Sequence, residues 1–178
     1  MKKAVLHLGF VSVFMLIWHS VLTVQYYSGG LPYSAAFRVT GAMLAAAAAV
    51  HGAISVVQMV KNVRKMKGHR YYSKLITDGT AQNTTGLFVV GFLIIHAVCV
   101  ELNLAFDIRG LRILQLVFDI AFYASVCLHL CITMPHMLIS YGMVTRKSVY
   151  TVLRAVICAV FLVFLAVLIR AETIFMLA

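Results

Sequence analysis

The stretch Gln82–Leu104, QNTTGLFVVGFLIIHAVCVELNL, decides the class of fold to which this chain belongs. It is long and apolar enough to cross the hydrocarbon core of a bilayer, which takes about 20 helical residues. One ionisable side chain, His96, lies well inside the run. Because an imidazole in hydrocarbon is costly without a partner, an intramembrane histidine is a functional hypothesis by default.

The composition indicates a polytopic membrane protein that forms one domain over residues 1–178. Of these residues 63% are hydrophobic and 11% are charged, whereas soluble domains carry roughly 25% charged residues. The formal charge is +10, but the basic residues form no groove-facing stripe with aromatic residues, so nucleic acid is not an expected partner. They suit topology signals and contacts with anionic lipid or an acidic protein.

Four further apolar runs predict an all-α bundle of five transmembrane helices. The first run is longer than the apolar region of a signal peptide, about 7–15 residues, and is expected to be retained. In chain order the predicted helices cover Ala4–Tyr26, Ala35–Val60, Gln82–Leu104, Ile113–Tyr141 and Val149–Ile169. Gly142 is expected to cap the fourth helix, and Arg170 and Glu172 to mark the far end of the fifth.

The lysine and arginine residues predict the orientation of the bundle. Ten fall on one side of the membrane, at positions 2, 3, 61, 64, 65, 67, 70, 74, 146 and 147. Four fall on the other side, at positions 38, 109, 112 and 170. The positive-inside rule therefore places the N-terminus inside and the C-terminus outside, in a multi-pass protein expected in the bacterial cytoplasmic membrane.

Three other predicted helices carry a histidine at similar depth: His19, His51 and His129. At a rise of 1.5 Å per residue, His19 and His96 lie roughly 22 and 20 Å above the inner ends of their helices. His51 and His129 lie roughly 14 and 15–18 Å up. We therefore expect His19/His96 and His51/His129 to ligate two b haems, each pair joining two helices. Hydrogen-bonded packing and a proton relay are the alternatives for each histidine.

The cysteine pattern limits the other cofactors that this chain can hold. All four cysteines lie inside apolar runs, and the chain has no C-x-x-C and no C-x-x-C-H motif. Neither an iron–sulfur site nor covalently attached haem is supported. A Gly-rich dinucleotide fingerprint is also missing from the sequence.

Acidic and basic residues in the outer half are candidates for a quinone site. Quinone chemistry moves protons with electrons, so its site needs a titratable or hydrogen-bonding group beside an apolar slot. Asp119, Glu101 and Arg38 meet that description. The alternative is that Asp119 pairs with Arg112 or Arg38 and that Glu101 marks the membrane boundary.

His136 and Arg64, in the inner half, are candidates for contact with a haem propionate or a partner protein. His136 lies two turns inward of His129 on the same helix face and could replace it as a ligand. A hydrogen bond to a haem propionate or to a partner is the preferred role for His136. Arg64, in the basic segment after the second helix, is assigned the same kind of contact.

At this point the sequence resembles a family, the di-haem cytochrome b membrane anchors of succinate:quinone and quinol:fumarate oxidoreductases. Gln82-Asn83-Thr84-Thr85-Gly86 followed by His96 is similar to the family's Q-R-x-T-G…H. Three other segments also resemble the family: IWHS, His51-Gly52 followed by MVKNVRKMKGHRYYS, and CLHLCITMPHMLISYGMVTRKS. The chain departs from the family at Asn83, where an Arg is usual, and at Thr133, where a Gly is often found.

The resemblance implies an anchor subunit, with no dicarboxylate chemistry of its own, for a dehydrogenase of the tricarboxylic acid cycle or a fumarate reductase. A flavoprotein subunit carrying FAD and an iron–sulfur subunit would dock on its cytoplasmic face. Electrons would pass between the iron–sulfur clusters, the two haems and membrane quinone. The direction of catalysis stays open. So do two alternatives, a cytochrome b subunit of a hydrogenase or formate dehydrogenase, and a haem-free transporter or structural bundle.

The predicted orientation can be tested by labelling single cysteines. In a background without the four native cysteines, Gly30→Cys should react with an impermeant thiol reagent added outside whole cells. Ser73→Cys should react only after the membrane is opened, because it lies in the basic segment. Equal labelling of both positions in intact cells would refute this orientation.

Overall fold

A computed structural model describes residues 2–66, 73–143 and 147–177. The described residues contain no β-strand and form five helices: α1 (Lys2–Tyr27), α2 (Ala35–Met66), α3 (Ser73–Phe106), α4 (Arg109–Ser140) and α5 (Lys147–Leu177). Each helix is long and apolar enough to cross a membrane. A helix satisfies its own backbone hydrogen bonds, as a segment in hydrocarbon must. The predicted all-helical, five-span membrane protein is therefore confirmed.

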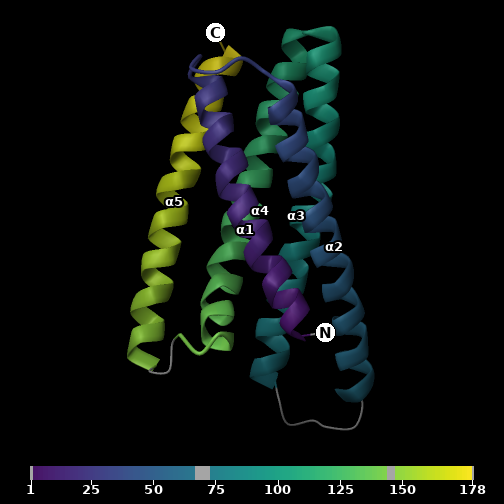
Figure 1. Ribbon diagram of the computed structural model, residues 1–178, viewed down its shortest axis with the longest axis vertical. Coiled ribbons are helices and arrows are strands. Elements are labelled where there is room, and N and C mark those ends of the chain that lie inside the picture. Colours follow the sequence, from purple (N-terminus) through teal and green to yellow (C-terminus); the bar gives the residue numbers. More distant parts are fainter. Residues whose placement is uncertain (1, 67–72, 144–146, 178) are drawn as a thin grey trace.

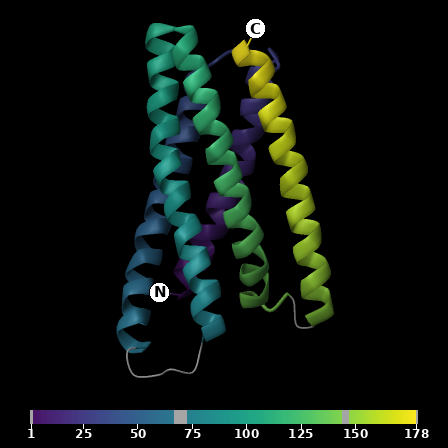
Figure 2. The same ribbon diagram turned by 180° about the vertical axis from the view of Figure 1, so that it is seen from behind.

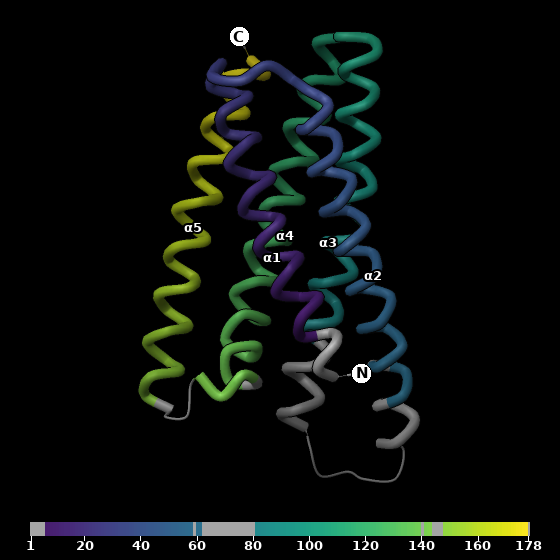
Figure 3. The backbone as a smooth tube through the Cα atoms, viewed as in Figure 1, coloured from purple at the N-terminus to yellow at the C-terminus, as the bar shows by residue number. Residues whose placement is uncertain are grey.

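The helices stand side by side in an elongated bundle (Figure 1). α4 packs against α3 on one side and α5 on the other, as the view from behind shows (Figure 2), and α1 packs against α2 and α5. α1 crosses the bundle obliquely (Figure 3). The first part of α1 lies beside α2, and its last part lies beside α5, near the C-terminus of the chain. We call the end that holds the C-terminus the upper end, as it is drawn in Figure 1, and the opposite end the lower end.

Most helices extend beyond the predicted spans. α2 continues to Met66 and α3 begins at Ser73, so the basic segment predicted as a loop is partly helical. α4 begins at Arg109 rather than Ile113, and α5 continues to Leu177. Hydropathy marks only the part of a helix that lies in hydrocarbon, whereas the hydrogen-bonded backbone continues into the polar boundary.

The predicted cap of α4 is confirmed. Gly142 adopts φ 74°, a left-handed conformation in which a side chain would be strained. Its N–H donates to the carbonyl of Ile139 at 2.9 Å, and the N–H of Met143 donates to the carbonyl of Leu138 at 3.0 Å. These bonds satisfy carbonyls that the last turn of a helix otherwise leaves free.

Two of the three fully buried side chains among the described residues are acidic, and the third is Pro135. Asp119 and Glu172 are completely buried, and Gln115 is nearly so. Large apolar side chains such as Phe14 and Leu87 are exposed instead. In a bilayer this arrangement is favourable, because lipid solvates apolar side chains while polar groups find partners between the helices.

Candidate functional site

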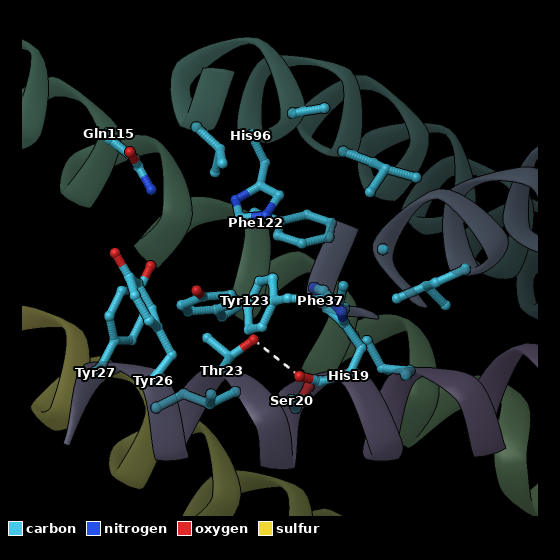
Figure 4. A pocket seen from close by; sticks show the side chains of 18 of the residues that line it. His19, Ser20, Thr23, Tyr26, Tyr27, Phe37, His96, Gln115, Phe122 and Tyr123 are labelled. Carbon is cyan, nitrogen blue, oxygen red and sulfur yellow. Dashed lines mark hydrogen bonds between the residues drawn. The ribbon is translucent and has the colours of Figure 1, made fainter. Parts of the chain in front are cut away.

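The predicted outer histidines, His19 and His96, line one cavity of about 590 Å³ in the upper half of the bundle. His19 comes from α1 and His96 from α3, and the two side chains enter the cavity from different helices (Figure 4). The rest of the wall is mainly aromatic and aliphatic, with side chains such as Phe37, Phe122 and Tyr123. A mostly apolar cavity with a few polar groups is the usual form of a cofactor site.

His19 is held by a threonine and by a small residue on α2. A Cβ atom at Gly41 would lie 3.1 Å from His19 Cε1, so the missing side chain makes room for the imidazole. His19 Nδ1 lies 3.2 Å from Thr40 Oγ1. The Thr40 hydroxyl donates its only hydrogen to the carbonyl of Phe37 at 2.9 Å. With that hydrogen engaged, Thr40 is placed to accept from His19, and we assign the proton to Nδ1 and the lone pair to Nε2.

His96 is held in the same tautomer by a carboxylate. Its Nδ1 donates to Asp119 Oδ1 at 2.6 Å, a short bond of the charge-assisted kind. The other oxygen of Asp119 accepts from Gln115 Nε2 at 3.1 Å. The ring of Phe122 stacks on His96 with centroids 5.3 Å apart and an interplanar angle of 21°. The orientation of this imidazole is thus fixed on two sides, with Nε2 left as the acceptor.

The predicted inner histidines, His51 and His129, also come together. They belong to α2 and α4 and lie close enough to interact electrostatically. A Cβ at Gly86 would lie 3.2 Å from His129 Cε1, and one at Gly9 would lie 3.1 Å from His51 Cε1. Both imidazoles therefore pack against glycines of neighbouring helices, as His19 does.

A threonine sets the tautomer of His129. Its Nδ1 lies 3.0 Å from Thr85 Oγ1. The Thr85 hydroxyl donates to the carbonyls of Ala81, at 2.8 Å, and Gln82, at 3.1 Å. With that hydrogen engaged, Thr85 accepts from His129 Nδ1. Three of the four predicted ligands therefore share one arrangement, with Nδ1–H donated to a neighbouring helix or to a carboxylate and Nε2 free to accept.

Glu172 is a buried titratable group that the sequence analysis assigned to the end of the last helix. The side chain is 0% exposed, because α5 continues for more than two turns beyond the predicted end at Ile169. Tyr27 Oη donates to Glu172 Oε1 at 3.3 Å, and Asp119 lies close enough to interact with it. The apolar residues after Glu172, Ile-Phe-Met-Leu at 174–177, were the sequence signal that the span continues.

The predicted quinone-site residues divide into two groups. Arg38 and Glu101 form an exposed ion pair of 2.8 Å, linking α2 to α3, and both line the upper cavity. Asp119 is not among the lining residues, because it lies behind the wall and is bonded to His96. It pairs with neither Arg38 nor Arg112 in this arrangement, since Arg112 lies 3.7 Å from Asp107 instead.

The two remaining candidates lie at the lower end. The ring of His136 lies 6.3 Å from that of Tyr150 on α5, centroid to centroid. The side chain of Arg64 falls outside the described residues. His7, which the sequence analysis did not single out, meets Tyr141 there, with Nδ1 2.8 Å from the phenolic oxygen.

Comparisons with protein-family models, curated proteins and solved structures find no match to this chain. Its chemistry has to be argued from its own residues. Within residues 2–66, 73–143 and 147–177, no three or more His, Cys, Asp or Glu side chains gather into a group that could hold a metal ion. What the arrangement offers is paired imidazoles, each pair supplied by two helices.

The glycine packed against His129 provides a test of this arrangement. Gly86→Val should lower the free energy of unfolding by about 1–3 kcal/mol, because the new methyl groups meet the imidazole. Gly91→Val, on the same helix, is the control, because nothing lies within 4 Å of its Cβ position. Melting temperatures can be measured with a thiol-reactive dye that reports exposure of the native cysteines. Equal losses in both variants would contradict the packing.

Proposed function

We propose that this chain is the haem-bearing membrane anchor of a succinate:quinone or quinol:fumarate oxidoreductase. The observation that supports this most is the common arrangement of His19, His96 and His129. Each has Nδ1 within 2.6–3.2 Å of an oxygen, which assigns the proton to Nδ1, and among the described residues no hydrogen bond engages its Nε2. A ligating histidine characteristically donates its other N–H to a carboxylate, carbonyl or similar acceptor, which fixes the ring and raises its basicity.

The residues present fit b-type haem. Haem brings four nitrogen ligands of its own and takes one or two more from the protein, so a pair of imidazoles is a complete protein contribution. In the upper half, His19 and His96 would hold it in the 590 Å³ cavity. In the lower half, His51 and His129 would do so. When bound, the haem would supply one-electron redox chemistry.

The contribution of the protein is orientation and exclusion of water. Two imidazoles on one iron leave no open position, which suits electron transfer rather than oxygen binding. Gly41 and Gly86 allow the rings to pack closely against neighbouring helices. Rings held on several helices would be fixed before a haem binds and would need little rearrangement during electron transfer.

The proposed docking of soluble partners rests on the positive charge of two segments of the chain. In the proposed orientation, with the N-terminus inside, the basic segments at 61–74 and 143–148 face the cytoplasm. There they would dock an iron–sulfur subunit and, through it, a flavoprotein with FAD. Both cofactors must come from partners, because this chain carries no cysteine cluster and no dinucleotide fingerprint.

A quinone site is proposed next to the haem of the upper cavity, on the side where Arg38 and Glu101 line the wall. Arg38 and Glu101 lie at its polar rim and can donate and accept hydrogen bonds to a quinone oxygen. Aromatic side chains such as Tyr33 and Phe37 line the apolar part nearby. Asp119, predicted as a direct contact, would act through His96, because the carboxylate is buried behind the wall.

Haem content tests the proposed function directly. Protein expressed in haem-replete cells should contain two b haems per chain, measured by pyridine haemochrome against protein concentration. Replacing His96 with alanine should remove or disturb one haem and leave the other, and His129→Ala should affect the complementary one. One haem or none in intact wild-type protein would contradict the proposal.

The quinone site has its own test. Arg38→Gln should keep both haems and slow their reduction by a water-soluble quinol roughly tenfold, since a hydrogen bond to a charged group contributes about 1.5–3 kcal/mol. Arg109→Gln removes the same charge on the neighbouring α4, at a position that does not line the cavity, and should not alter the rate. A wild-type rate in Arg38→Gln would exclude the side chain from the site.

A further inference from the structure

The hydrogen-bond partners of the proposed ligands are not equivalent. His19 and His129 donate to threonine hydroxyls, at 3.2 and 3.0 Å. His96 donates to a carboxylate, and the distance is 2.6 Å. A carboxylate is a stronger acceptor than a hydroxyl, because it carries a charge. Among these three imidazoles, His96 is thus the one with the most strongly polarised N–H.

The position of Asp119 favours a large effect on His96. The carboxylate is completely buried, so water does not screen it. Gln115 holds its second oxygen at 3.1 Å, and Asn103 donates in turn to Gln115. The stacked Phe122 keeps the imidazole in line with the acceptor. These contacts therefore fix the Asp119 carboxylate and the His96 ring relative to each other.

Polarising the N–H changes the other nitrogen of the ring. As Asp119 draws the proton of Nδ1, electron density rises at Nε2, and the imidazole becomes a stronger donor to a metal. A stronger axial donor and a nearby negative charge both favour the more positively charged, oxidised state of an iron. Threonine hydroxyls supply neither effect at His19 or His129.

We infer that Asp119 is a positioning residue that lowers the reduction potential of the iron ligated by His96. This inference rests on the proposed function, since it concerns the haem that His96 would bind. It assigns to Asp119 a role that needs no contact with quinone. The two haems of one chain would thereby differ in potential through a single carboxylate.

Glu172 supplies a matched control. It is a second carboxyl group, as buried as Asp119 and close to it, but the hydrogen bond to His96 belongs to Asp119. Glu172→Gln changes the same kind of group in the same region and leaves the Asp119–His96 bond in place. Comparing the two variants separates the effect of the Asp119–His96 hydrogen bond from that of altering a buried carboxyl group nearby.

The experiment is a redox titration of the purified, haem-loaded chain, followed by the α-band absorbance of each haem. Asp119→Asn should shift the reduction equilibrium of one haem at least tenfold toward the reduced form, which is 59 mV for a one-electron couple. The low-spin electron paramagnetic resonance signal of the same haem should shift as well. Glu172→Gln should move the potential by less and leave that signal in place. Asp119→Glu, which restores a carboxylate, should recover most of the wild-type potential.

Several outcomes decide the matter. Two haems with unchanged potentials in Asp119→Asn would overturn the inference and leave the proposed function standing. Equal shifts in Asp119→Asn and Glu172→Gln, with an unchanged resonance signal, would also overturn it, because altering either buried carboxyl group would then suffice. Wild-type protein without haem would overturn the proposed function itself. If Asp119→Asn loses the haem, the other two variants decide. Potentials near wild type in both Asp119→Glu and Glu172→Gln support the inference. A tenfold shift in Glu172→Gln alone contradicts it.

Discussion

An imidazole in the membrane must find an acceptor for its N–H, and this requirement organises the bundle. The structure meets it with Thr40 for His19, Thr85 for His129 and Asp119 for His96. An unsatisfied polar group in hydrocarbon costs several kcal/mol, so each of these bonds constrains how two helical segments can pack. Because Nδ1 is bonded to the acceptor, Nε2 lies on the opposite side of the ring. A buried histidine in this orientation is a candidate ligand.

The same constraint explains where the small residues lie. Gly9, Gly41 and Gly86 each face an imidazole of a neighbouring helix at a distance that a Cβ would crowd. In membrane helices small residues usually allow close backbone packing. Here they make room for rings, so the helices can approach each other without displacing the histidines. Stability and the proposed cofactor site therefore depend on the same contacts.

The upper end combines these features with buried charge. Asp119 and Glu172 are two carboxyl groups enclosed by the helices, held by Gln115 and Tyr27. Both oxygens of Asp119 are hydrogen-bonded, whereas Glu172 has a partner at Oε1 and none at Oε2 among the described residues. His19, His96 and the ion pair of Arg38 with Glu101 line one cavity, so the proposed haem and quinone sites would belong to one connected region.

The sequence by itself determined the five helices and the depth of the histidines, because hydropathy and the helical rise depend only on the order of residues. It grouped His19 with His96 and His51 with His129 by depth, and the structure places the members of each pair near each other. Their ligation of haem stays a prediction. Only the tertiary structure decided which acceptor each histidine meets. Asp119 was a candidate for a quinone contact or an ion pair with Arg112 or Arg38, and the structure shows its bond to His96. Glu172 was assigned to a helix end, yet it is enclosed. Which side chains meet between two helices depends on the rotation and tilt of each helix. The periodicity of a single segment specifies neither of them.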